Sequence, residues 1–274
     1  MSYRLQQGGT AMKRKPDISL ASYSFHGLLA AGMIDVFNYL NITKFRYRVN
    51  RADIWSGFFP TLEEAFIEKI RQTLEENEMA LANLCVDGAH VWENDPDERA
   101  KNAKKAAEFI RIGETLGAKT IRIDTGGRDA TWTEEQFDTI VKQYRKWARR
   151  AGDMGYRIGT ENHWGATQRP ANVVKLAKAV DHPAFGVLFH FGGVLDMDVD
   201  QGNDMLVPYA MHTHIMASVA ETCGPLMGKL MDAGYQGTFS CEHHTGKNEY
   251  AQVEWQLGAI RRNLALLMDE RAGK

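Results

Sequence analysis

The sequence contains little cysteine: there are three in 274 residues, Cys85, Cys223 and Cys241, and no two of them form a C-x-x-C pair. Three widely spaced cysteines cannot all pair with one another, so a disulfide framework and a thiolate zinc site are both disfavoured. Cys85 and Cys241 lie within apolar runs, where we expect them to be buried as small hydrophobic residues.

The chain also lacks a surplus of one charge and long apolar runs. Its 33 Lys and Arg residues nearly balance 35 Asp and Glu residues, for a net charge of −2, which leaves no basic surplus for the phosphate backbone of nucleic acid. No run approaches the roughly 20 apolar residues of a membrane span, and the N-terminal stretch has no apolar core of signal-peptide length. We therefore expect a cytoplasmic protein whose partners include neither nucleic acid nor membrane.

Signatures of three other groups of enzymes are missing. No lysine lies at the end of a predicted strand, which disfavours aldol chemistry through a Schiff base. The sequence has no G-x-S-x-G nucleophile elbow and no P-loop. Its chemistry must therefore come from other side chains.

The chain does contain a regular alternation of strand-like and helix-like segments. Residues 1–16 are polar and aperiodic, and we interpret them as a flexible arm. Eight strand–helix units without a linker between them follow, which predicts an α/β protein with a single (β/α)8 TIM barrel over residues 17–274. The connection at residues 194–208 fits a loop or a helix equally well. The predicted strands are residues 17–27, 51–60, 81–92, 120–127, 157–165, 185–193, 209–217 and 237–246.

Local signals place several of the helices between these strands. Capping boxes, in which the first and fourth residues satisfy each other's free amides, are predicted at 61–64 and 133–136. Gly117 is a predicted C-cap and Pro170 a predicted first helical residue. The predicted helices are residues 32–40, 61–74, 100–117, 133–147, 171–180, 225–233 and 249–270.

Histidines gather at the predicted strand ends. Eight of the nine lie at or just past a strand's C-terminus, and only His182 does not. The active site of a (β/α)8 enzyme is built from that rim, so the clustering favours a functional role over random placement. The eight are His26, His90, His163, His190, His212, His214, His243 and His244.

Four residues at the ends of consecutive predicted strands form a candidate metal site: Glu161, His190, His214 and Glu242. Neighbouring strands lie about 4.8 Å apart, so side chains at equal heights can converge on one cation. Two carboxylates and two imidazoles suit Mn²⁺, which we predict, with Zn²⁺ or Co²⁺ as alternatives. Mg²⁺ is less suitable because it prefers oxygen ligands.

The strand-end motifs resemble those of the xylose-isomerase-like TIM-barrel superfamily. This sugar phosphate isomerase/epimerase group includes ketose 3-epimerases, hydroxypyruvate isomerase, inosose dehydratase and endonuclease IV. The resemblance extends over residues 17–267 and rests on IWSGFFP, TENHWG, VLFHFGG, HTHIMA and GTFSCEHHTG. It implies metal ligands of the order Glu, Asp, His, Glu, which match Glu161, His190, His214 and Glu242. His190 departs from the pattern, and Asp196 and Asp198 are alternatives that lie well past the strand end.

The resemblance also implies an activity. In epimerases of this family the two glutamates, here Glu161 and Glu242, exchange a proton on a carbon next to a carbonyl, while the metal stabilises the enediolate. We therefore predict a divalent-metal-dependent isomerase or epimerase that acts on a small carbohydrate. A lyase or dehydratase acting on a keto-sugar, keto-glycoside or cyclitol is the alternative, because both reactions begin with the same proton abstraction. The extra acid for elimination would be His163, His212, His244, Asp53 or Asp124.

Further residues near the strand ends are candidates for contact with the substrate. Trp55 and Trp164 offer flat walls for a sugar ring. Arg122 and Asp124 lie on one face of their strand and are predicted to form an ion pair. Two further hypotheses are a phosphodiesterase like endonuclease IV and a sugar-binding barrel without activity. The sequence does not specify the substrate, the stereochemistry or the oligomeric state, and a homo-oligomer is one possibility. The predicted substrate-binding residues are His26, Trp55, His90, His163, Trp164, His212 and His244.

Overall fold

Eight parallel strands close into one barrel in chain order, β1 to β8. The computed structural model describes residues 16–273, so the predicted arm falls almost wholly outside the described residues. The closed parallel barrel with helices between its strands confirms the predicted (β/α)8 fold. The strands are β1 Ile18–Ala21, β2 Arg51–Trp55, β3 Ala80–Val86, β4 Thr120–Ile123, β5 Arg157–Glu161, β6 Phe185–Phe191, β7 Ala210–Met216 and β8 Phe239–Glu242.

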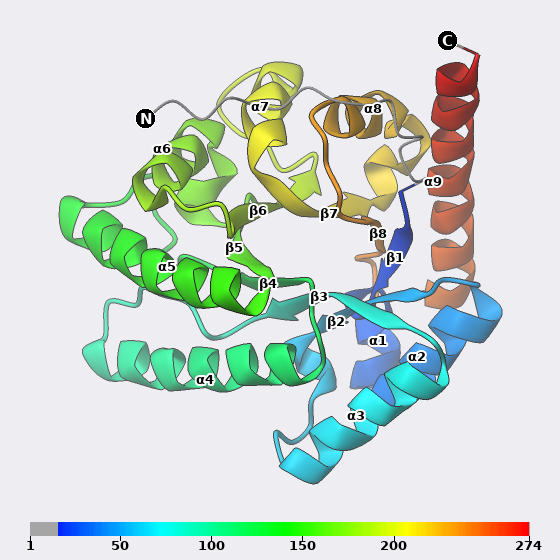
Figure 1. Cartoon of the computed structure of the whole chain (residues 1–274), viewed down its shortest axis with the longest axis horizontal. Helices are drawn as coiled ribbons and strands as arrows, with labels where there is room; N and C mark the ends of the chain where they lie inside the picture. The colour runs from blue at the N-terminus through cyan, green and yellow to red at the C-terminus, as the bar shows by residue number, and fades with distance from the viewer. Residues whose placement is uncertain (1–15, 274) are drawn as a thin grey trace.

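Helices surround this barrel, and the long α9 packs against β8 (Figure 1). Within residues 16–273, no helix combines the length and the apolar character needed to cross a membrane. Short 3-10 turns and one π-helical turn, Ile42–Arg46, complete the connections. The α-helices are α1 His26–Ala30, α2 Val36–Asn41, α3 Glu64–Glu76, α4 Pro96–Thr115, α5 Glu134–Met154, α6 Pro170–Val180, α7 Val199–Leu206, α8 Gly224–Asp232 and α9 Glu249–Ala272.

Most of the local helix signals are confirmed, and one is wrong. The capping box of Thr133 and Gln136 is present at the start of α5, and Pro170 opens α6. The box predicted for Thr61 and Glu64 does not form, because α3 begins only at Glu64 and the Thr61 hydroxyl accepts instead from the amide of Glu63. The hydroxyl thus satisfies a backbone donor in the turn before the helix.

Several segments differ from their predicted extent: the predicted strand 17–27 ends at Ala21 and His26 begins α1, the predicted strand 51–60 ends at Trp55, and the predicted helix 32–40 begins at Val36. β3 ends at Val86, so residues 87–92 form a loop, which pairs again with the chain after β4 through a bridge between Trp92 and Gly126. The ambiguous connection 194–208 contains the short helix α7, which Asp198 caps by accepting from the amide of Gln201. Because β3 ends at Val86, His90 lies in the loop and not at the end of the strand.

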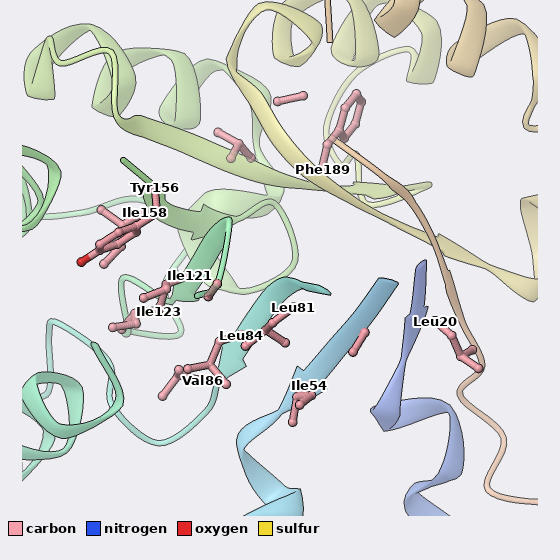
Figure 2. Close-up of a cluster of buried hydrophobic side chains, with 14 of the residues drawn as sticks. Leu20, Ile54, Leu81, Leu84, Val86, Ile121, Ile123, Tyr156, Ile158 and Phe189 are labelled. Carbon is pink, nitrogen blue, oxygen red and sulfur yellow. The ribbon is translucent and has the colours of Figure 1, made fainter. Parts of the chain in front are cut away.

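The main hydrophobic core lies between the strands and the helices. Leu20, Ile54, Leu84, Ile121 and Ile158 come from five consecutive strands, and each is fully buried (Figure 2). Leu84 and Ile121 face α4, since a Cβ added at its Gly113 would meet both side chains. Because side chains alternate along a strand, the intervening residues point into the barrel.

The inside of the barrel carries an unusual polar layer. TIM-barrel interiors are usually filled by bulky branched residues, but here Asp53 Oδ1 accepts from Asn83, whose own oxygen accepts from Thr120, both at 2.8 Å. The other oxygen of Asp53 accepts from Ser240 at 2.8 Å and lies 2.7 Å from Nε2 of His212. All five residues are buried, so this hydrogen-bonded layer lies within the barrel, below the carboxyl ends of the strands.

Candidate functional site

The four predicted metal ligands all lie at the carboxyl ends of the strands. Glu161 and Glu242 are the last residues of β5 and β8, and His190 on β6 pairs in register with His214 on β7. Their exposed fractions are between 0% and 6%. Four ionisable side chains at this depth are costly unless each is paired.

Three imidazoles converge on one oxygen of Glu242. Its Oε2 lies 3.2 Å from Nε2 of His190, 3.1 Å from Nδ1 of His214 and 2.8 Å from Nε2 of His244. Burial by itself would raise the pKa of Glu242, but the three imidazoles outweigh it and hold this pKa well below its usual range. Glu242 is therefore the carboxylate around which the three imidazoles gather.

Glu161 lies between a cation and two imidazoles. Its Oε2 is 3.1 Å from Nε of Arg122, and its Oε1 is 3.6 Å from Nδ1 of both His163 and His214. Burial would raise the pKa of Glu161, but the Arg122 guanidinium and His214 lower it to about 2. The carboxylate is thus ionised at neutral pH.

The predicted ligands do not form one simple set of four. Ligand atoms of Glu161, His214 and Glu242 lie within 4.8 Å of one another, and so do those of His190, Glu242 and His244. The two groups meet at Glu242. A further group joins Glu161 and His190 with His163, so two predicted substrate-binding residues lie among the candidate ligands.

The chemistry of these donors fits a divalent cation. Nε2 of His190, Nδ1 of His214, Oε2 of Glu242 and Nε2 of His244 are all buried and, within residues 16–273, none has a hydrogen-bond partner. Such orphaned atoms are rare in native proteins and require an explanation. Neutral imidazoles and a carboxylate with free lone pairs are the ligands that Zn²⁺, Co²⁺ or Mn²⁺ binds.

The alternative ligands Asp196 and Asp198 lie elsewhere. Both are exposed; Asp196 pairs with Arg169, and Asp198 caps α7. Asn162 ties the end of β5 to β6, because its side chain accepts from the amide of His190 at 2.7 Å and donates to the carbonyl of the same residue at 3.1 Å. It also donates to the carbonyl of Gly193, in the loop after β6, at 3.3 Å. Asn162 directly follows Glu161, and this position was the signal for its positioning role.

Asp53 holds His214 from below. Its Oδ2 lies 2.9 Å from Nε2 of His214 and 2.7 Å from Nε2 of His212. Burial would raise the pKa of Asp53, but the two imidazoles lower it far below its usual value. The same contact leaves Nδ1 of His214 directed at the two glutamates. The polar position in β2 was visible in the sequence, but its partners on β7 were not.

Arg122 joins three carboxylates beside the site. The predicted ion pair with Asp124 is confirmed at 2.8 Å, and the same nitrogen lies 2.6 Å from Asp87. The guanidinium also reaches Glu161, as described above. Burial, together with Glu161 and Asp87, raises the pKa of Asp124 to about 7 despite Arg122. The Arg122 guanidinium therefore lies beside three carboxyl groups, and one of them, Glu161, is a candidate catalytic base.

Aromatic rings line the side of the site that faces solvent. Tyr23, which sequence reasoning missed, stacks on His26 and meets Trp55 and His244 edge-on at 5.1 and 5.6 Å. Trp55 donates to Asp87 at 2.7 Å. Trp164 is 56% exposed and packs on His163, which in turn stacks on His190 at 4.5 Å. The position of Tyr23 just past β1 was its only signal.

Three predicted substrate-binding residues are not brought to the ligand cluster. His212 lines a cavity of about 750 Å³ that is also lined by the starts of several strands, and it meets the site from below, through Asp53 and edge-on against His214 at 5.7 Å. His90 lines a separate cavity of about 290 Å³ between α4 and α5, because β3 ends early. His26 lies on the rim, where its Nδ1 donates to the carbonyl of Tyr23 at 2.8 Å.

Comparisons with known proteins agree with the fold. The family model described as xylose isomerase-like TIM barrel matches residues 46–263. A search of curated protein sequences found no significant match. Three solved structures with 12–14% identity have TM-scores of 0.72, 0.70 and 0.68. The first is 3-keto-D-glucoside 4-epimerase YcjR from E. coli, at 12% identity, with 90% of this chain and 100% of that chain covered. The second is the probable 3-DHS dehydratase AsbF involved in petrobactin synthesis from Bacillus anthracis, at 14% identity, with 89% of this chain and 98% of that chain covered. The third is a xylose isomerase-like TIM barrel protein from Mycobacterium smegmatis in complex with magnesium, at 14% identity, with 92% of this chain and 98% of that chain covered.

Proposed function

Because the chain belongs to the xylose isomerase-like TIM barrel family, we propose that it is a sugar isomerase or epimerase that depends on a divalent metal ion. The proposed reaction removes a proton from a carbon next to a carbonyl and returns it to carbon through an enediolate. A small carbohydrate is the proposed substrate, since an epimerase of a keto-glucoside is among the similar structures.

One observation carries this proposal. Glu161 and Glu242, from β5 and β8, approach the same nitrogen, Nδ1 of His214, at 3.6 and 3.1 Å. One oxygen of each carboxylate lies within 4.8 Å of the other. A substrate carbon bound over this point would have a carboxylate in reach on either side, which is what proton exchange at one carbon needs.

The charge state of the two carboxylates suits a base. Arg122 and His214 keep Glu161 ionised, and the imidazoles do the same for Glu242. Both carboxylates are therefore ionised at neutral pH, the form that a base needs before it can accept the substrate proton. Because Arg122 and Asn162 hold Glu161 and the neighbouring loop in place, the base is pre-positioned and little entropy is lost when the substrate binds.

Glu161, His190, His214 and Glu242 are the residues that we propose to hold the metal. When bound, a divalent ion would polarise the substrate's carbonyl and adjacent hydroxyl oxygens and offset the negative charge that develops on them. Asp53 orients His214 for this task by fixing its other nitrogen.

The rim provides a surface for the sugar. Tyr23, Trp55 and Trp164 present aromatic faces or edges around the half-exposed imidazoles of His163 and His244. Such rings pack on the apolar C–H face of a sugar, while imidazole nitrogens bind its hydroxyls. Their position above the glutamates would also limit the access of water.

A lyase is the second candidate, and a specific arrangement favours it. His163 and His244 lie on the solvent side of Glu161 and Glu242, at 3.6 and 2.8 Å, so an imidazole stands beside each carboxylate. Either imidazole could protonate a leaving group expelled from the enediolate. Asp53, by contrast, is held by four hydrogen-bonding neighbours inside the barrel and is not available as that acid.

Incubation in D₂O tests the proposal. The purified protein is mixed with ketoses, keto-glucosides and inososes, with and without a chelator, and the products are followed by NMR and ultraviolet absorption. An isomerase or epimerase incorporates solvent deuterium at one carbon and loses this activity with the chelator. A lyase instead produces an enone or enol that absorbs in the ultraviolet. No deuterium in any substrate and no absorbing product would reject both candidates.

A further inference from the structure

The imidazole of His244 lies closer to Glu242 than either of the predicted histidine ligands. The distance from its Nε2 to Oε2 of Glu242 is 2.8 Å, compared with 3.2 Å for His190 and 3.1 Å for His214. His244 also belongs to the group of His190 and Glu242 whose ligand atoms all lie within 4.8 Å. In position, it is therefore equivalent to the predicted ligands.

The local chain explains how His244 reaches this place. Glu242 is the last residue of β8, and His244 lies two residues further, where an extended chain returns to the same side. The residue between them points elsewhere: the Nε2 atom of His243 lies 2.7 Å from the hydroxyl of Thr245. The sequence His243-His244 thus sends one imidazole into the site and one away from it.

The Nε2 atom of His244 has no hydrogen-bond partner among the described residues. It is buried although the side chain is 32% exposed. The facing nitrogens of His190 and His214 are also buried and, within residues 16–273, have no such partner. Three imidazoles around one carboxylate oxygen cannot all be satisfied by it, whereas a cation can accept a lone pair from each.

We propose that His244 is a further metal ligand, so that the centre contains three imidazoles, from His190, His214 and His244, and selects Zn²⁺ over Mn²⁺. This inference rests on the proposed function, because it concerns the same metal site. Two carboxylates with two imidazoles suit Mn²⁺. Each added imidazole favours metals later in the first transition series, because nitrogen ligands suit Zn²⁺ and oxygen ligands suit Mn²⁺ and Mg²⁺. His190, in place of the family's aspartate, shifts the preference in the same direction.

Metal affinities of matched variants test the inference. The dissociation constants for Zn²⁺ and Mn²⁺ are measured by competition with a chromophoric chelator in the wild type, in His244→Ala and in His26→Ala. The last is the control, because His26 is a half-buried rim imidazole that stacks on the same Tyr23 but has no contact with Glu242 among those described. We expect His244→Ala to weaken Zn²⁺ binding about 10- to 100-fold or more and Mn²⁺ binding less, and His26→Ala to change neither.

A spectroscopic signature separates a ligand from a substrate contact. In the Co²⁺-substituted protein, loss of an imidazole ligand changes the d–d absorption, and free imidazole diffusing into the space left in His244→Ala restores it. X-ray absorption of the Zn²⁺-loaded wild type, which needs no variant, should count three imidazole ligands. Unchanged Zn²⁺ affinity and Co²⁺ spectrum in His244→Ala, or a count of two, would overturn the inference. A wild type that binds no divalent ion would instead overturn the proposed function itself.

Discussion

The carboxylate of Asp53 lies 2.9 Å from Nε2 of His214, the imidazole whose other nitrogen faces both glutamates. A neutral imidazole carries one proton, and its partner decides which nitrogen holds it. When a metal ion is bound, the Nε2–H of a neutral His214 donates a hydrogen bond to Asp53, which leaves the lone pair of Nδ1 for the ion. The polar layer inside the barrel thus prepares one ligand at the rim.

Replacement of Asp53 by Asn should weaken divalent-ion binding about 10- to 100-fold, because the neutral amide must turn its NH₂ group toward donors that the carboxylate accepts from, either Asn83 or the two imidazoles. It should also lower the free energy of unfolding by about 1–3 kcal/mol, since a buried hydrogen-bonding group is left without a suitable partner. Ser240→Ala is the control: it removes one hydrogen bond to the same oxygen, costs about 1 kcal/mol, and leaves metal affinity unchanged. Titration calorimetry and urea unfolding measure both. Equal metal affinity in the Asp53 variant and the wild type would contradict the role of Asp53.

A saturating divalent ion should stabilise the protein. A ligand present at 100 times its dissociation constant adds about 2.7 kcal/mol to the free energy of unfolding, which corresponds to a rise in Tm of about 5–10 °C for a chain of this size. Thermal unfolding with added Zn²⁺ or Mn²⁺ is compared with unfolding in excess chelator. In the double variant Glu161→Gln, Glu242→Gln the shift should disappear. A wild type whose Tm is the same under all conditions would have no functional metal centre.

The variant Asp124→Asn should change how stability depends on pH. The pKa of Asp124 is raised by burial to about 7 in the folded chain, against about 3.9 when unfolded. Between these values only the folded state keeps the proton, so this carboxyl makes the wild type less stable as pH rises from about 4 to about 7. Asn imitates the protonated acid and cannot ionise. Urea unfolding at several pH values should show the stability of the variant relative to the wild type increasing over this interval and levelling above it; a constant difference would contradict the raised pKa.

Gln256 connects α9 to the site and should be sensitive to substitution. Its amide is fully buried and donates to the carbonyls of Ile215 at 2.6 Å and Glu242 at 2.9 Å. Gln256→Leu leaves both carbonyls without this donor and should lower the free energy of unfolding by about 1–3 kcal/mol. The exposed Gln252→Leu on the same helix should change it by less than about 0.5 kcal/mol. Equal stability of the two variants would show that this connection contributes nothing.

The barrel and the strand ends at which Glu161, His190, His214 and Glu242 lie were predictable, because alternating patterns and strand-end residues are local features of the sequence. The height of each side chain along the barrel axis was not predictable. His212 and His214 share one face of β7, but two residues span about 6.6 Å along a strand. One imidazole therefore reaches the glutamates, while the other lies beside Asp53 in the layer below.

Other differences depend on contacts that the sequence alone does not show. His90 does not lie at the rim, because β3 ends at Val86. Strand ends are the least certain part of a pattern-based prediction. The reach of Arg122 to Glu161 depends on a long side chain that crosses between strands. His244 could be placed at the rim, but its approach to Glu242 became apparent only from the structure.

Deuterium exchange in single-glutamate variants tests the central claim most directly. Glu161→Gln and Glu242→Gln are incubated in D₂O, in parallel with the wild type, with the substrate found by screening. Glu114→Gln serves as control, because Glu114 pairs with Arg150 on the outer helices. We predict that the wild type and Glu114→Gln incorporate deuterium next to the carbonyl, and that each site variant does so at least about 10²-fold more slowly. Exchange at the wild-type rate in both site variants would contradict the account.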